Sequence, residues 1–156
     1  MRCNLKERLI KLVATGFGCG LAPALPGTVG TLPGIPLYLL LTAFGWPAYL
    51  LFLIVFTGGA VYIAQAAEGL FAAKDPPRIV IDEVAGFLWT MFLVPPTLAG
   101  IFFGFIFFRF FDIVKPYPIR LFQDKLPGGY GVVADDVMAG IYSNLALHIL
   151  MKSPWL

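Results

Sequence analysis

Two long apolar tracts, each interrupted near its middle, limit what this chain can fold into. The tracts cover residues 32–67 and 79–108, so each exceeds the roughly 20 residues of one bilayer-spanning helix. A Gly-Trp-Pro sequence at 45–47 interrupts the first tract, and two prolines at 95–96 interrupt the second. Because proline lacks a backbone N–H and clashes with the preceding turn, helices end at such points. Each tract therefore predicts a hairpin of two short helices, and both turns should point the same way.

A last apolar segment, at about 137–151, predicts one more helix, which leads to Lys152. Hydrophobic residues make up 59% of the 156 residues, whereas ordinary soluble domains have about half even when glycine is counted. We therefore expect an all-α, polytopic membrane protein. About five short transmembrane or re-entrant helices and their interfacial loops should form one site, in a single membrane-embedded domain that covers residues 1–156.

The arrangement of the hairpins predicts which loops lie together. Two hairpins cross the bilayer an even number of times, so the segments 15–31, 74–83 and 109–136 should all emerge on one side. All of the eleven Lys and Arg residues except Lys152 fall on that side. By the positive-inside rule, this side is expected to be cytoplasmic.

The first residues predict a helix at the membrane surface. Leu5, Leu9, Leu12 and Val13 recur at helical spacing, with charged residues opposite them. A plain basic flank that only orients the first hairpin explains the same charges, and the sequence does not decide between the two.

A glycine-rich segment at 15–31 follows and predicts a loop, because it combines five glycines with two prolines. Thr31 is a candidate N-cap for a helix that begins near Leu32. Such a loop presents backbone N–H groups to an anion, which makes Thr28, Gly30 and Thr31 candidate phosphate-binding residues. A tight turn at the membrane surface is the simpler alternative.

The densest charge in the chain lies between Arg109 and Asp136. Ionisable groups against a membrane-like background are unfavourable, so they usually mark function. If a helix ends at Lys115, then Arg109, Asp112 and Lys115 share one of its faces, and Pro116 forces the exit.

Two acidic pairs stand out, Asp82-Glu83 and Asp135-Asp136, and each is expected to open an apolar helix. Gly86 and Gly140, each four residues beyond an acid, would allow close helix approach. A simple cap needs only one exposed acid, so we interpret the pairs as functional.

Carboxylates from different helices repel one another unless a cation lies between them. Hard oxygen ligands without Cys or His favour Mg²⁺ over zinc. Together with Arg109 and Lys115, such a cation would give the composition of a phosphoryl-transfer site. Membrane transporters also combine acids, bases and broken helices, so this composition alone leaves both classes open.

Four motifs in this order resemble the phosphatidylglycerophosphatase A family, and they cover nearly the whole chain. The motifs are Gly16-Phe17-Gly18-x-Gly20-x-x-Pro23-x-x-Pro26-Gly27-Thr28-x-Gly30-Thr31, Ile79-Val80-x-Asp82-Glu83-x-x-Gly86, Phe108-Arg109-x-x-Asp112-x-x-Lys115-Pro116-x-Pro118-Ile119, and Gly128-Gly129-x-Gly131 with Asp135-Asp136-x-x-Ala139-Gly140. The resemblance implies an all-helical, Mg²⁺-dependent enzyme of the bacterial cytoplasmic (inner) membrane. It also implies hydrolysis of phosphatidylglycerophosphate to phosphatidylglycerol and phosphate.

The site residues follow from the motifs and the charges together. Metal binding is expected of Asp82, Glu83, Asp135 and Asp136. Asp112 is a further ligand or the catalytic base, and phosphate binding is expected of Arg109, Lys115, Thr28, Gly30 and Thr31.

The expected partners are the lipid substrate and the bilayer, with no nucleic acid because the net charge is only +2. A small anion transporter and a non-catalytic membrane scaffold are the alternatives, and the sequence leaves the number of metal ions, the oligomeric state and the acyl-chain preference open.

Overall fold

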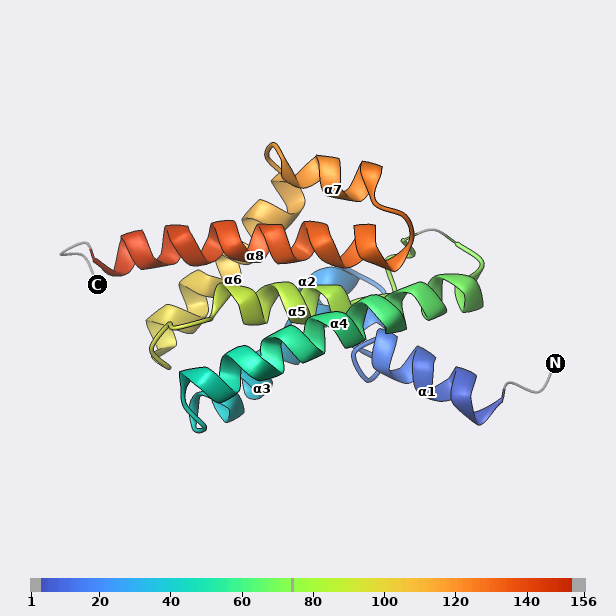
Figure 1. Cartoon of the computed structure of the whole chain (residues 1–156), viewed down its shortest axis with the longest axis horizontal. Helices are drawn as coiled ribbons and strands as arrows, with labels where there is room; N and C mark the ends of the chain where they lie inside the picture. Colours follow the sequence, from blue (N-terminus) through green and yellow to red (C-terminus); the bar gives the residue numbers. More distant parts are fainter. Residues whose placement is uncertain (1–3, 74, 153–156) are drawn as a thin grey trace.

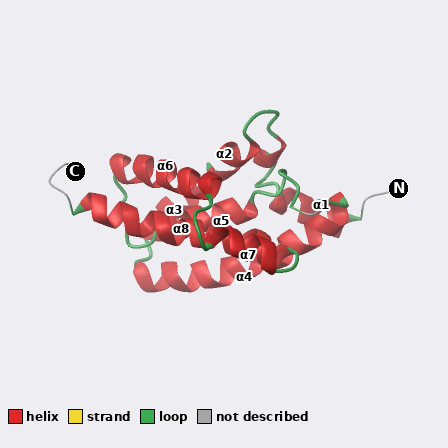
Figure 2. Ribbon diagram, turned by 90° about the horizontal axis from the view of Figure 1, so that it is seen from above, coloured by secondary structure: helices red, strands yellow, loops and turns green. Residues whose placement is uncertain are grey.

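The computed structural model of the chain describes residues 4–73 and 75–152, apart from the side chains of Gln123 and Asp124. Arg2 and Lys74, two of the basic residues used for the predicted topology, lie outside these ranges. Every regular element in the described ranges is a helix, as Figure 2 shows, which confirms the all-α prediction. The elements are α1 (Leu5–Ala14), the 3₁₀ turn η1 (Cys19–Leu21), α2 (Pro26–Thr31), α3 (Gly34–Thr42), α4 (Trp46–Phe71), α5 (Ile81–Thr90), α6 (Leu98–Val114), α7 (Ile119–Lys125) and α8 (Gly129–Met151).

Helix α5 is the centre of the molecule. It contacts α2, α3, α4, α6 and α8, and Figure 1 shows it between α4 and α8. Phe87 and Leu88 of α5 are fully buried and belong to a core that also contains Phe108 of α6 and Leu147 of α8. Burial of large apolar side chains is the main favourable term in folding, so α5 is the element around which the other helices pack.

Glycines bring α5 and α8 into backbone contact, as the small-residue spacing predicted. A Cβ atom on Gly140 would lie 2.3 Å from the carbonyl oxygen of Gly86. A Cβ atom on Gly86 would lie 2.6 Å from the carbonyl oxygen of Asp136. Both distances are shorter than any real carbon–oxygen contact, so only glycine allows this approach at either position.

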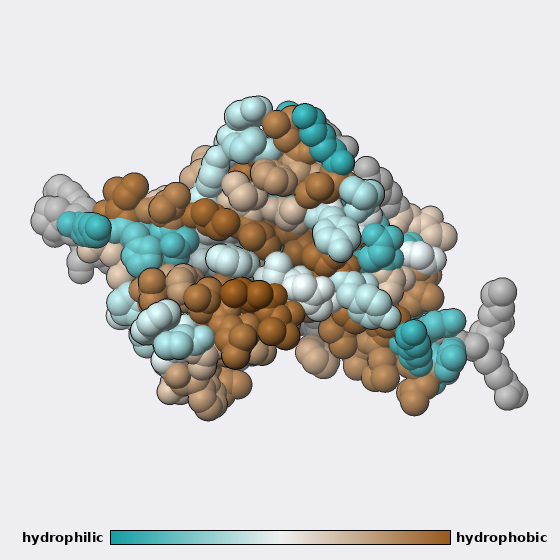
Figure 3. Space-filling view, in the orientation of Figure 1, coloured by the Kyte–Doolittle hydropathy of each residue, from teal (hydrophilic) through white to brown (hydrophobic). Residues whose placement is uncertain are grey.

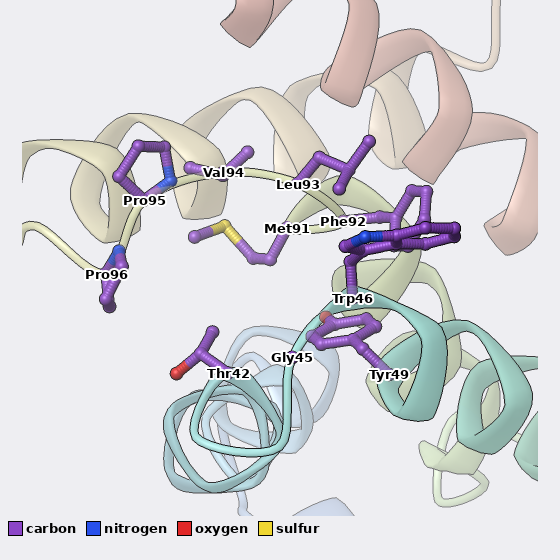
Figure 4. Close-up of a pocket in the computed structure, with 10 residues that line it drawn as sticks. All are labelled: Thr42, Gly45, Trp46, Tyr49, Met91, Phe92, Leu93, Val94, Pro95 and Pro96. Atoms are coloured by element: carbon purple, nitrogen blue, oxygen red, sulfur yellow. The ribbon is translucent and has the colours of Figure 1, made fainter.

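The two predicted turns are confirmed, and they lie side by side. The first separates α3 from α4 at Gly45, and the second separates α5 from α6 around the two prolines. Residues from both turns line one cavity of about 250 Å³, and Figure 4 shows them facing each other across it. Tyr38 Oη donates a hydrogen bond to the carbonyl oxygen of Val94 at 2.8 Å, which fastens α3 to the second turn. The two hairpins therefore turn at the same end of the molecule, as predicted.

Three predicted boundaries are wrong. The segment 15–31 is not wholly irregular, because Pro26 begins the short helix α2. Thr31 ends α2 and does not cap the next helix, and its hydroxyl donates to the carbonyl oxygen of Gly27 at 2.9 Å. Helix α8 begins at Gly129, well before the predicted 137, and α7 was not predicted at all.

One helix in the described part of the chain, α4, is long and apolar enough to cross a membrane. Its 26 residues extend for about 39 Å at the α-helical rise of ~1.5 Å per residue. Helices α3 and α5 have 9 and 10 residues, about half of what a bilayer crossing requires. The structure therefore does not confirm the predicted five short transmembrane or re-entrant helices. Apolar side chains are nevertheless widely exposed, and Figure 3 shows them spread over much of one face.

Helix α1 has the predicted amphipathic form. Leu5, Leu9 and Leu12 are 71%, 52% and 45% exposed, while Val13 packs against the core beside α4. The side chain of Glu7 accepts a hydrogen bond from the backbone N–H of Asn4 and completes a capping box. An exposed leucine face among basic residues is typical of a helix that lies at a membrane surface.

The α5–α8 contact predicts opposite effects of one substitution at two glycines. Gly140→Ala forces the two helices apart and should destabilise the protein by about 1–3 kcal/mol, the usual range for overpacking. Gly58→Ala in α4 is the matched control, because a Cβ atom there meets nothing within 4 Å and alanine favours the helix. Thermal unfolding in detergent measures both. Equal melting temperatures for the two variants would contradict the backbone contact.

Candidate active site

Acidic side chains from four segments surround one cavity of about 120 Å³. The segments are the connection between α4 and α5, the first turn of α5, the end of α6 and the first part of α8. The lining residues are Asp75, Pro77, Ile79, Asp82, Glu83, Asp112, Lys115, Val132, Asp135 and Asp136. At ~30 Å³ per water molecule, the volume corresponds to about four waters. The cavity therefore suits an ion and a phosphate group, and it is far too small for acyl chains.

The deepest acids of this cavity are not fully hydrogen-bonded. Asp82, Asp135 and Asp136 are 6%, 2% and 4% exposed. One oxygen of each, Asp82 Oδ1, Asp135 Oδ1 and Asp136 Oδ2, is buried without a hydrogen-bond partner. Buried polar groups are almost always paired, because an unpaired one is strongly unfavourable. These three oxygens around one cavity are donor atoms that a cation could bind.

Burial and mutual repulsion raise the pKa values of these acids. Burial raises the pKa of Asp82 well above its usual value, and the charges of Glu83, Asp75 and Asp135 raise it further. Burial also raises the pKa of Glu83 to about 7, although Arg109 acts in the opposite direction. The site thus resists carrying all of its negative charge, which a bound cation would relieve.

Lys115 faces the cavity from the end of α6. It has a left-handed backbone conformation, with φ of 44°, and its N–H caps the helix by donating to the carbonyl oxygen of Phe111. Its Nζ forms an ion pair with Asp135 Oδ2. Burial alone would lower the pKa of Lys115, but Asp135, Asp136 and Asp112 together outweigh that effect and raise it. Lys115 is therefore a charged ammonium group held at the cavity wall.

Arg109 lies behind the cavity, one helical turn before Asp112. Its Nη1 is 2.9 Å from Asp112 Oδ2 and 3.5 Å from Glu83 Oε1. The same nitrogen donates to Thr31 Oγ1 at 3.5 Å, and Nε is buried without a partner. The predicted common face of Arg109, Asp112 and Lys115 is thus confirmed for the first two residues by direct contact. Arg109 itself does not line the cavity.

The glycine-rich helix α2 packs against this ion pair. A Cβ atom on Gly27 would lie 2.3 Å from Glu83 Oε1 and 2.8 Å from Arg109 Nη2. Gly30 and Thr31 are buried, Thr28 is half-buried, and none of the three lines the cavity. The structure therefore places the predicted phosphate-binding segment beside Glu83 and Arg109, one layer away from the cavity.

Asp135 and Asp136 lie in the second turn of α8, because the helix begins earlier than predicted. The expectation that this pair opens its helix is wrong. The favourable effect of a helix dipole is confined to the first turn, so it does not explain these acids.

Gly129 N–H donates to Gln65 Oε1 of α4 at 2.8 Å, and a Cβ atom on Gly129 would lie 2.4 Å from the carbonyl oxygen of Val61. The Gly-Gly motif therefore seats the start of α8 on α4.

No three His, Cys, Asp or Glu side chains in the described ranges are already positioned to hold a metal ion. Lys115 and Arg109 instead occupy oxygens of Asp135, Asp112 and Glu83. The unpaired oxygens and the all-oxygen donor set nevertheless fit a hard divalent cation. Side-chain rotations would be needed to complete such a site.

Asp75 is a cavity residue that the sequence did not reveal as part of the site. It lines the cavity from the connection between α4 and α5. The one sequence signal for Asp75 was its position seven residues before Asp82, in the segment 74–83 that was predicted to emerge on the same side of the membrane as the other acids. An acid that precedes two prolines is also a common turn residue, so this signal was weak.

Comparisons with known proteins agree on one family. A family model described as Phosphatidylglycerophosphatase A matches residues 12–151. The Escherichia coli protein named Phosphatidylglycerophosphatase A is 36% identical over 141 residues, which cover 89% of this chain and 81% of the relative. The Haemophilus influenzae protein of that name is 39% identical over 143 residues, covering 90% and 88%. A Bacteroides thetaiotaomicron protein whose name describes a phosphatidylinositol-3-phosphatase is 37% identical over 147 residues, covering 88% and 91%. No solved structure gives a significant match.

The raised pKa of Asp82 predicts how stability depends on pH when divalent cations are removed. The folded protein keeps a proton on Asp82 that the unfolded chain releases above about pH 4. The folded state therefore binds more protons than the unfolded state, and stability falls as the pH rises from about 4 toward the raised pKa. Asp82→Asn removes this titration and should flatten the decline. Melting temperatures at several pH values in EDTA test this, and an unchanged slope in the variant would contradict it.

Proposed function

Because this chain belongs to the phosphatidylglycerophosphatase A family, we propose that its acid-lined cavity brings Mg²⁺ and the terminal phosphate of phosphatidylglycerophosphate together. The chain is a phosphatase that hydrolyses this lipid to phosphatidylglycerol and inorganic phosphate. The observation that supports the proposed cation site is the set of three buried carboxylate oxygens without hydrogen-bond partners.

The charge balance of the cavity supports a cation. Lys115 is the only basic residue among the described residues that line it, against six acids: Asp75, Asp82, Glu83, Asp112, Asp135 and Asp136. A phosphate monoester carries nearly two negative charges at neutral pH and would be repelled by such a wall. Oxygen ligands, the absence of Cys and His from the lining and the phosphate substrate all favour Mg²⁺.

We assign the metal to Asp82, Glu83, Asp135 and Asp136. When bound, Mg²⁺ would act as a Lewis acid that offsets negative charge on the phosphate. Lys115 is the residue placed to bind a phosphate oxygen, since its ammonium group lines the same cavity. Its present partner, Asp135, would then be free for the cation.

Asp112 is proposed as the catalytic base. Its carboxylate lines the cavity, and Arg109 holds Oδ2 at 2.9 Å, which fixes the orientation of the group. Attack of water on phosphorus breaks the bond from phosphorus to the glycerol oxygen. The water loses a proton to Asp112, and the departing glycerol oxygen takes up a proton from bulk water. Thr28, Gly30 and Thr31 support this arrangement from behind, because α2 packs against Glu83 and Arg109.

The lipid is expected to reach the cavity from the membrane while its acyl chains stay in the bilayer. We propose a multi-pass arrangement in the bacterial cytoplasmic membrane, with the acid cavity on the cytoplasmic side. The cavity and the paired turns lie at opposite ends of α4, near Asp75 and Trp46 respectively. A membrane crossed by α4 would therefore separate them.

Phosphate release tests the activity and the metal together. Purified protein should release phosphate from phosphatidylglycerophosphate when Mg²⁺ is present and lose most of that activity in EDTA. Asp136→Asn should reduce turnover by at least about 100-fold, because a ligand charge is lost while the shape is kept. Glu7→Gln, which removes a carboxylate on α1, is the matched control and should act normally.

Phosphatidylinositol-3-phosphate serves as the second substrate in this assay, since one relative is named for it. If phosphatidylinositol-3-phosphate is hydrolysed faster than phosphatidylglycerophosphate, it is the preferred substrate and the proposal is wrong. Transport of phosphate into liposomes without hydrolysis would instead favour a transporter, and full activity of Asp136→Asn would remove this acid from the site.

Cysteine labelling tests the proposed sides of the membrane. In a variant that lacks Cys3 and Cys19, Arg78→Cys and Lys125→Cys should resist impermeant reagents applied to intact cells. Phe44→Cys, at the α3–α4 turn, should be labelled, because this side chain is 66% exposed at the opposite end of α4. Labelling of all three sites from one side would contradict the arrangement.

A further inference from the structure

Asp75 lies on the connection between α4 and α5, in a conformation that side chains rarely adopt. Its φ is 47°, and Ala72, which ends α4, has φ of 51°. Left-handed backbone is unfavourable for residues other than glycine, so the surroundings must hold it in place. Asp75 lines the acid cavity together with the acids of α5 and α8.

Glu68 holds this connection. Its Oε1 accepts a hydrogen bond from the backbone N–H of Asp75 at 2.7 Å. Its main-chain carbonyl oxygen accepts another from the N–H of Ala73 at 3.3 Å. Glu68 therefore binds the connection at two points, one of which is the N–H of the residue that faces the cavity.

A glutamate at position 68 is unfavourable for helix α4 by itself. Glu68 is only 9% exposed, and burial of a carboxylate carries a substantial desolvation penalty. It also lies in the last turn of α4, where the helix dipole opposes negative charge. Leucine or alanine would serve the helix better, so the role of Glu68 lies outside α4.

We propose that Asp75 is a fifth carboxylate of the cation site and that Glu68 is the positioning residue that directs it into the cavity. This inference rests on the proposed Mg²⁺ site. A second, independent observation supports it: Asp82 Oδ1 and Asp135 Oδ1 are buried without hydrogen-bond partners at the same cavity.

The alternative is that Asp75 only forms a turn before Pro76 and Pro77. In that case its charge would be irrelevant, and asparagine, which forms the same turns, would replace it without consequence. Cation binding distinguishes the two roles, because a turn residue does not change the affinity for a metal.

The experiment measures Mg²⁺ binding by calorimetry on the full chain in detergent. Asp75→Asn should weaken binding by at least about tenfold, while its melting temperature in EDTA stays the same or rises because repulsion is relieved. Asp82→Asn is the reference for loss of a proposed ligand, and Glu7→Gln is the control for loss of a distant acid.

Two substitutions of Glu68 test the positioning role. Glu68→Gln keeps an oxygen that accepts the N–H of Asp75, so Mg²⁺ affinity should stay within about twofold of the wild type. Glu68→Ala removes the acceptor and should weaken binding by about tenfold, the usual effect of losing an outer-shell partner. Rescue by glutamine but not by alanine is the pattern expected of a positioning residue.

The outcomes separate this inference from the function on which it rests. Normal Mg²⁺ affinity in Asp75→Asn, with loss in Asp82→Asn, overturns the role of Asp75 and leaves the proposed site intact. Normal affinity in Glu68→Ala, or equal losses in both Glu68 variants, overturns the positioning role. A wild-type protein that hydrolyses the lipid without binding Mg²⁺ overturns the cation site and this inference with it.

Discussion

The backbone contact between α5 and α8 is the constraint on which the site depends. At Gly86 and Gly140 the two helices approach more closely than any side chain allows. Asp82 and Asp136 lie one helical turn before these glycines, so the same contact forces their carboxylates into one buried space. Repulsion between the acids would separate two loosely packed helices. The apolar core around Phe87 prevents that separation, and the protein thereby keeps negative charge concentrated where water is scarce.

Protein cations pair with carboxylates that a bound metal ion would also need. Without a metal, Lys115 pairs with Asp135, while Arg109 pairs with Asp112 and Glu83. A divalent ion that binds the acids would weaken both pairings and make the side chain of Lys115 available to a phosphate oxygen. Phosphate would in turn draw Lys115 away from Asp135 and favour the metal. By linkage, such binding would be mutually reinforcing, because each ligand would raise the affinity of the site for the other.

Local chemistry explains which features the sequence could predict. Prolines are unfavourable beyond the first turn of a helix, so both hairpin turns were predictable, and the spacing of Gly86 and Gly140 from the acids predicted a close approach. Thr31 was misplaced because the glycine-rich segment gains its helical turn by packing on Glu83 and Arg109, a contact with residues distant in sequence. Asp75 was missed for a different reason. Its position depends on a hydrogen bond from its backbone N–H to Glu68, seven residues earlier across the end of α4, and no helical or strand periodicity encodes that bond.

The length of α4 explains why a lipid phosphatase would place its acids at this point in the fold. A hydrocarbon core of ~30 Å takes about 20 helical residues to cross. Counted from Trp46, 20 residues of α4 end at Gln65. Gln65 and Glu68 are the two side chains of α4 that accept hydrogen bonds from other segments of the site. If α4 crosses the bilayer in this way, Glu68 and Asp75 lie beyond Gln65, at the depth of the lipid headgroups. The polar end of α4 therefore has the right length to hold the cavity at the membrane surface, where a phosphate stays hydrated while its acyl chains remain in the bilayer.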